Sequence, residues 1–105
     1  MPRFHITWEM NLLEMPKAPE ERVKLLLTLL GMVKADLNAK GFKMDWGVDA
    51  GGSQGYAVWE GPSDTELNTM LLKFTPYVIF KTRPALTVYQ AEESLMKAVA
   101  ASQKK

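Results

Sequence analysis

The only histidine of the chain, His5, stands four residues before the carboxylate of Glu9. Polar and apolar residues alternate along 3–10, which predicts a half-buried β-strand with both of these side chains on the same face. An imidazole and a carboxylate beside a substrate can abstract a proton next to a carbonyl and return it to another carbon. We therefore expect His5 and Glu9 as candidate catalytic residues of an isomerase-type reaction. The alternative is that His5 is an ordinary polar residue on a solvated or interface-facing strand.

Further side chains could complete a pocket around His5 if its strand is central in a sheet. They would come from the neighbouring strands and supply phenol, carboxylate and ammonium groups. We expect these candidate ligand-binding residues to be Tyr56, Glu60, Tyr77 and Lys81.

The three tryptophans, Trp8, Trp46 and Trp59, could stack on a flat ligand, although large aromatic rings more often fill a core. Trp59 is the preferred candidate for lining a pocket. Gly55 and Ala57 precede it on the same face of its strand and would leave space beside the ring.

Other charged or flexible residues point less specifically to chemistry. Lys81 and Arg83 could bind a carboxylate-bearing ligand, or could protect the end of a strand against edge pairing. Asp45 and Asp49 are typical of a solvated strand face, and no recognised ligand spacing predicts a metal site. The segment 51–55 is glycine-rich but lacks the Gly-Lys-Ser/Thr ending of a phosphate loop, so it is interpreted as a hairpin turn.

Length and composition limit the class of protein. The 105 residues suffice for one domain, expected as a core over 1–90 followed by a C-terminal helix and tail over 91–105. A formal net charge of +1 disfavours a nucleic-acid-binding protein, and the absence of cysteine excludes disulfides and thiolate-bound metals. Neither a signal peptide nor a membrane span is expected, so the sequence predicts a soluble, cytoplasmic protein without a cofactor.

The pattern of the chain predicts alternating strands and helices. Strands are expected over 3–10, 42–49, 54–60 and 77–83, and helices over 19–40, 63–74 and 91–99. The order β-α-β-β-α-β is that of an α+β, ferredoxin-like fold: a four-stranded antiparallel sheet with two helices on one face, here followed by a C-terminal helix. The first helix should bury a stripe of apolar residues, and close packing of a neighbour would explain Gly31 within it. That stripe comprises Val23, Leu26, Leu27, Leu30, Val33, Ala35 and Leu37.

Two strand segments, 56–59 and 77–80, are apolar on both faces. Such strands are usually buried on both sides, yet the two helices cover only one face of the sheet. We therefore expect a homodimer in which a second copy of the chain covers the other face, with the C-terminal helix crossing over.

The chain also resembles the small dimeric α+β barrel proteins, and among them most closely muconolactone isomerase and short stand-alone relatives of unknown function. The resemblance rests on the stretches 4–6 (Phe-His-Ile), 56–63 (Tyr-Ala-Val-Trp-Glu-Gly-Pro-Ser) and 74–77 (Phe-Thr-Pro-Tyr). It implies a homodimer with small-molecule pockets. The connection containing Pro16 and Pro19 and the added C-terminal helix depart from that pattern.

The expected function is therefore binding of a small molecule, with an isomerase-type reaction that moves a proton on an acidic or lactone-like substrate. One alternative is a non-catalytic module that senses a metabolite or binds a partner protein. A further alternative is a cofactor-free monooxygenase that holds an oxidisable ring in an aromatic pocket.

Overall fold

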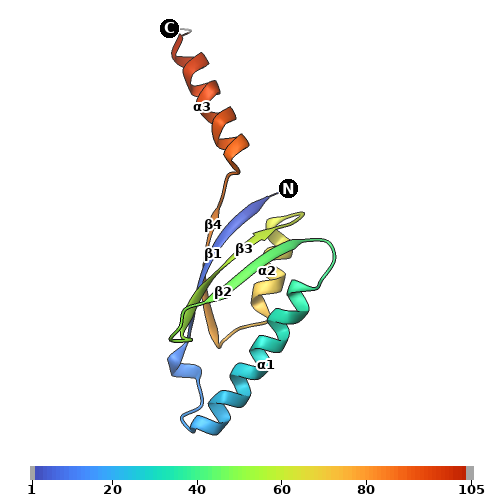
Figure 1. Cartoon of the computed structure of the whole chain (residues 1–105), viewed down its shortest axis with the longest axis vertical. Coiled ribbons are helices and arrows are strands. Elements are labelled where there is room, and N and C mark those ends of the chain that lie inside the picture. The colour runs from blue at the N-terminus through green and yellow to red at the C-terminus, as the bar shows by residue number, and fades with distance from the viewer. Residues whose placement is uncertain (1, 104–105) are drawn as a thin grey trace.

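The computed structural model describes residues 2–103, which form one sheet and three α-helices (Figure 1). The elements follow the order β1 (Arg3–Met10), α1 (Pro19–Leu37), β2 (Lys43–Val48), β3 (Gln54–Glu60), α2 (Asp64–Leu72), β4 (Val78–Pro84) and α3 (Val88–Gln103), with a short 3-10 turn at Leu12–Glu14. The sheet is antiparallel with strand order β2-β3-β1-β4. The predicted α+β, ferredoxin-like β-α-β-β-α-β fold with a C-terminal helix is confirmed.

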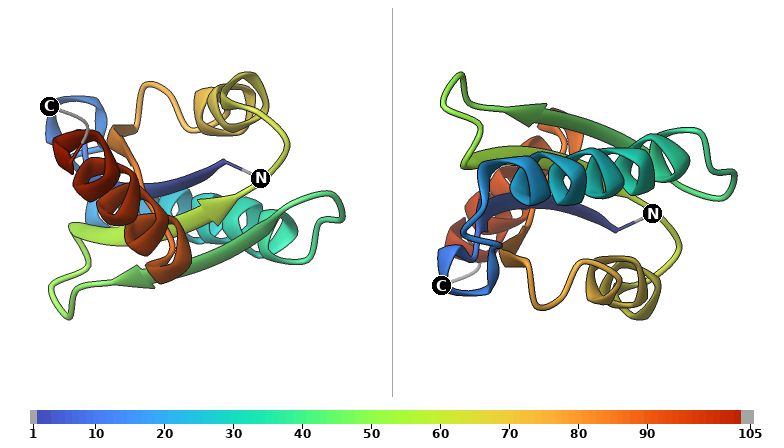
Figure 2. Two further views of the ribbon diagram at one scale, coloured as in Figure 1. Left: turned by 90° about the horizontal axis from the view of Figure 1, so that it is seen from above. Right: turned by 90° about the horizontal axis from the view of Figure 1, so that it is seen from below.

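Strand β1 lies in the middle of the sheet because both its edges are paired. Phe4, Ile6 and Trp8 are buried, while His5 and Glu9 are exposed, as the alternation along β1 predicts. One face of the sheet, which we call the helix side, therefore packs against α1 and α2 (Figure 2). The opposite face, which we call the outer face, carries the polar residues of β1.

Local signals in the sequence set the ends of several elements. Pro19 occupies the first position of α1, where its fixed φ suits a helix and no amide donor is lost. Ser63 caps α2, and its hydroxyl accepts a hydrogen bond from the backbone amide of Glu66 at 3.3 Å. Gly52 takes a φ of +79° in the turn between β2 and β3, which confirms the predicted hairpin.

Helix α1 buries a narrower stripe than the sequence predicts. Its buried residues are Leu29, Val33 and Asp36, whereas most of the expected stripe is exposed: Val23, Leu27, Leu30, Ala35 and Leu37. The reason is that residues 25–30 are apolar almost all round the helix, so that periodicity alone does not fix which side faces the sheet. The expectation for Gly31 is also wrong, because a Cβ at that position would meet no atom within 4 Å.

Two groups of buried residues form the core on the helix side. The first joins the sheet to α2 and contains Phe4, Ile6, Ala57, Trp59, Leu67 and Met70. The second joins α1 to the segment after α2 and contains Leu29, Val33 and Phe74. Among residues 2–103, the half-buried hydrophobic residues that pack against both groups are Met44, Trp46 and Phe80.

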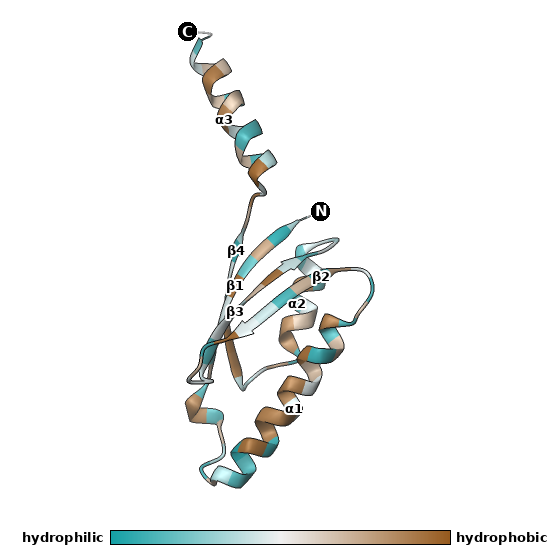
Figure 3. Cartoon of the chain, viewed as in Figure 1, coloured by the Kyte–Doolittle hydropathy of each residue, from teal (hydrophilic) through white to brown (hydrophobic). Residues whose placement is uncertain are grey.

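Helix α3 extends beyond the end of the sheet and gives the molecule a longest dimension of 65 Å (Figure 1). None of its described residues is buried. Hydrophobic residues nevertheless recur along it (Figure 3), and Leu95 and Val99 are 69% and 58% exposed. This single chain thus leaves the apolar side of α3 without a covering element.

Candidate functional site

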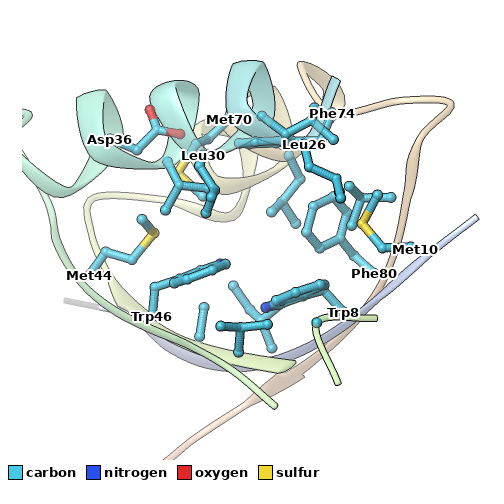
Figure 4. Close-up of a pocket in the computed structure, with 18 residues that line it drawn as sticks. Trp8, Met10, Leu26, Leu30, Asp36, Met44, Trp46, Met70, Phe74 and Phe80 are labelled. Carbon is cyan, nitrogen blue, oxygen red and sulfur yellow. The ribbon is translucent and has the colours of Figure 1, made fainter. Parts of the chain in front are cut away.

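A cavity of about 250 Å³ lies between the helix side of the sheet and the two helices that cover it (Figure 4). Side chains of the sheet form its floor, and α1, α2 and the segment after α2 contribute the roof. Leu30 and Val48, each partly exposed, mark its rim. Among residues 2–103, the lining side chains are apolar apart from the carboxylate of Asp36 and the indole Nε1 of Trp8, which is buried and has no hydrogen-bond partner there.

The indole rings of Trp8 and Trp46 form much of the floor of this cavity (Figure 4). Their planes are within 6° of parallel, and their centroids are 5.4 Å apart. The backbone explains how Trp8 fits, because a Cβ on Gly55 would lie 2.6 Å from the Trp8 ring. A flat, polarisable surface of this kind suits contact with an aromatic or alicyclic ring.

Trp59, the tryptophan favoured from the sequence, lies outside the cavity. It is completely buried, with its ring beside Phe4 and Phe42. The space expected above Gly55 exists on the correct face of β3, but the Trp8 ring from the neighbouring strand fills it.

Asp36 lies on α1 at one end of the cavity (Figure 4), and its side chain is only 9% exposed. Its Oδ1 accepts a hydrogen bond from Nζ of Lys73, at 2.6 Å, in a salt bridge that links α1 to the end of α2. The second oxygen, Oδ2, is buried and has no hydrogen-bond partner among residues 2–103. Sequence reasoning missed Asp36, because the leucine run of α1 does not show which side of the helix is buried. In the structure Asp36 follows the buried Val33 and Leu29 by three and seven residues and lies on their side of the helix.

His5 and most of the other candidates from the sequence lie together on the outer face, across the sheet from the cavity. Across the sheet, His5 of β1 lies between its register partners, Val58 of β3 and Arg83 of β4. Two residues further along the same face, Thr7 lies between its register partners, Tyr56 of β3 and Lys81 of β4. No hydrogen bond or ion pair within residues 2–103 links the His5 side chain to these neighbours.

Glu9 and Lys81 line a second pocket of about 330 Å³ on the outer face, together with Thr7, Asp49, Gln54 and Ile79. His5 is not part of this pocket. The structure therefore brings Glu9 to Lys81 but does not enclose the imidazole and the carboxylate in one site.

The two remaining candidates are separated from this group. In the strand register Glu60 lies opposite Arg3 of β1 and Lys43 of β2, at the other end of the sheet from Glu9. Tyr77 precedes β4 and packs, half-buried, against the group formed by Leu29, Val33 and Phe74. The tight connection after α2, in which the Tyr77 amide donates to the Phe74 carbonyl, places this ring away from His5.

Within residues 2–103, no cluster of three or more His, Asp or Glu side chains could hold a metal ion. The helices of the same region are too short or too polar to cross a membrane.

Comparisons with known proteins identify the family of the chain but no function. No curated protein and no solved structure matched it. The model of one family matches residues 2–99, nearly the whole chain. The protein therefore belongs to the family described as a domain of unknown function (DUF3303).

Proposed function

We propose that this protein binds a small, largely apolar ring compound in the cavity between the sheet and helices α1 and α2. The observation that carries the proposal is the chemistry of the lining, in which two near-parallel indole rings face aliphatic and methionine side chains. Apolar cavities of this kind favour apolar guests because water gains little from entering them.

The size of the cavity supports a ligand of one or two rings. Its volume is about 250 Å³. A dry apolar cavity of roughly 150 Å³ already accepts benzene, whereas pockets for drug-sized molecules usually start at roughly 300 Å³. A benzene ring with a short substituent is therefore the best-matched probe.

Binding is a better-supported function than proton transfer by His5 and Glu9. Both side chains are exposed on the outer face, and neither lines the cavity. A ligand in the cavity would be separated from them by the sheet itself. For the monooxygenase alternative, oxygen uptake during turnover of a bound phenol is the direct assay, and a flat trace would count against it.

Methionine methyl groups provide the test of binding. Met44 and Met70 line the cavity, whereas Met96 lies exposed on α3. In protein labelled with ¹³C at the methionine methyl groups, added 4-ethyltoluene should shift the Met44 and Met70 signals in a saturable manner and leave the Met96 signal unchanged. Equal shifts of all methionines, or none, would contradict the proposal.

Substitution at the rim gives a matched pair of variants. Leu30→Trp should fill the opening and abolish the shifts of Met44 and Met70. Leu27→Trp is the control, since Leu27 lies on the same helix, is exposed and does not line the cavity.

A homodimer through the outer face is the second part of this proposal. Tyr56 and Ile79 are 43% and 44% exposed there, although large apolar side chains of this kind are more often covered. Charge favours a second copy of the chain as the partner. The edge strand β4 carries Lys81 and Arg83 on this face. The opposite edge carries Lys43 and Asp45 on β2, and Asp49 follows β2 directly.

With a two-fold axis parallel to the strands, β2 of one protomer lies opposite β4 of its partner, so these charges attract. Light scattering behind size exclusion should then report a dimer at micromolar concentration. Asp45→Lys with Asp49→Lys should yield monomers, and adding Lys81→Glu and Arg83→Glu should restore the dimer. A monomeric wild-type protein would exclude this assembly.

A further inference from the structure

Among the residues that the structure describes, 2–103, the carboxylate of Asp36 is the only ionisable side chain that lines the cavity. A charged group in apolar surroundings is costly unless its oxygens are hydrogen-bonded. Lys73 satisfies Oδ1, but Oδ2 is left buried without a partner within residues 2–103. Oδ2 of Asp36 therefore lies behind the wall at the end of the cavity, where a hydroxyl group reaches it once the carboxylate turns toward the cavity. Among residues 2–103, no other charged group lines the cavity.

We propose that Asp36 selects ligands that carry a neutral hydrogen-bond donor, specifically a hydroxyl group on an aromatic ring. This inference rests on the proposed binding function and specifies its ligand class. The ring lies against Trp8 and Trp46, and the carboxylate of Asp36 turns toward the cavity, so that the hydroxyl donates to Oδ2 at the end seen in Figure 4.

The pairing of Asp36 with Lys73 determines which donor fits best. The ion pair is neutral as a whole, so a cationic ligand would bring an uncompensated charge into an apolar cavity. A carboxylate ligand would add a second negative charge beside Oδ2 and is rejected for that reason. A phenol avoids both costs and forms a hydrogen bond to an ionised acceptor, which is stronger than one between neutral groups.

Two ligands of equal shape isolate this contact. 4-Ethylphenol and 4-ethyltoluene differ only in the exchange of a hydroxyl for a methyl group. A cavity without an acceptor would favour 4-ethyltoluene, because the hydroxyl would lose its hydrogen bonds to water. With Asp36 as the acceptor, wild-type protein should bind 4-ethylphenol about tenfold more tightly than 4-ethyltoluene. 4-Ethylbenzoate should not shift the Met44 and Met70 signals.

Variants of Asp36 should remove the preference. Asp36→Leu replaces the carboxylate by an apolar group of similar size, and Lys73, whose side chain is 45% exposed, can then turn to water. In this variant 4-ethyltoluene should bind at least as tightly as 4-ethylphenol. Asp36→Asn, which retains an oxygen for Lys73, provides a second variant and should reduce the preference. Glu21→Leu, an exposed position of α1, is the matched control and should keep it.

The outcomes separate this inference from the proposed function. If neither 4-ethylphenol nor 4-ethyltoluene shifts the signals of Met44 and Met70, both proposals are overturned. If 4-ethyltoluene binds but 4-ethylphenol is not preferred, the cavity binds rings and the role of Asp36 is rejected. A preference that persists in both Asp36 variants would reject that role as well, whereas its loss in them and retention in Glu21→Leu supports it.

Discussion

Nζ of Lys73 lies 2.6 Å from Oδ1 of Asp36 and so fastens the end of α2 to α1 beside the cavity. Lys73→Met should lower the free energy of unfolding by about 1–2 kcal/mol, since it leaves a largely buried carboxylate without its counter-charge. Urea denaturation measures this change. Lys24→Met removes an exposed pair with Glu20 and should change stability by less than about 0.5 kcal/mol. Similar losses for both variants would show that the Asp36 pair contributes no more than a surface ion pair.

Substitution by alanine should lower the stability of the protein at Gly55 and raise it at Gly31. A Cβ on Gly55 would lie 2.6 Å from the Trp8 ring and collide with the backbone oxygen of Gly47, so Gly55→Ala should destabilise the protein by about 1–3 kcal/mol. Gly31 has open space around it on α1, and Gly31→Ala should stabilise by roughly 1 kcal/mol because alanine is the better helix former. Thermal unfolding of both variants tests the pair, and a stable Gly55→Ala protein would contradict the described position of Trp8.

Substitutions at Trp46 and Trp59 should have different effects, the first on the affinity for the ligand and the second on the stability of the fold. Trp46→Leu removes part of the cavity floor and should raise the Kd of 4-ethyltoluene about three- to tenfold, as expected for the loss of a ring contact. Trp59→Phe should lower stability, because Trp59 is fully buried, without changing that Kd. The methionine methyl titration provides the Kd. An equal loss of affinity in the two variants would place the binding site elsewhere.

The exposed apolar side of α3 should be part of the proposed dimer. Glutamates introduced at Leu95 and Val99 should shift the protein toward monomers, because burying a carboxylate in an interface is unfavourable. Sedimentation velocity over a range of concentrations measures the shift. Gln90→Glu, on the polar side of the same helix, is the control. Unchanged association of the double variant would mean that α3 lies outside the interface.

The sheet could be predicted from the sequence in detail. A strand has a period of two residues, so the alternation through Phe4, His5 and Ile6 fixes which side chains face the helices and which face away. The order of the elements then predicts β1 in the centre of the sheet, whereas the register that sets Tyr56 and Lys81 beside Thr7 comes from the structure. Local signals such as Pro19 and Ser63 placed the helix starts equally well.

The cavity could not be predicted, because it depends on how helices and sheet pack rather than on either pattern alone. The run of leucines in α1 leaves the rotation of the helix undetermined, so neither the exposure of Leu27 nor the burial of Asp36 follows from periodicity. The filling of the space above Gly55 by Trp8 is likewise a contact between strands distant in sequence. The polar residues that the strand pattern does indicate, such as His5 and Glu9, lie on the outer face and not at the cavity.

Because the core is divided into two groups, parts of the protein should unfold locally in a defined order. Helix α1 is held by Leu29, Val33 and Phe74, whereas α2 packs with the sheet in the other group. Elements held by few buried contacts open at lower free energy than the rest of a domain, so backbone amides of α1 should exchange with deuterium before those of β1 and β3. A guest between the two groups would touch both and merge them into one cooperative unit, slowing exchange in α1 selectively.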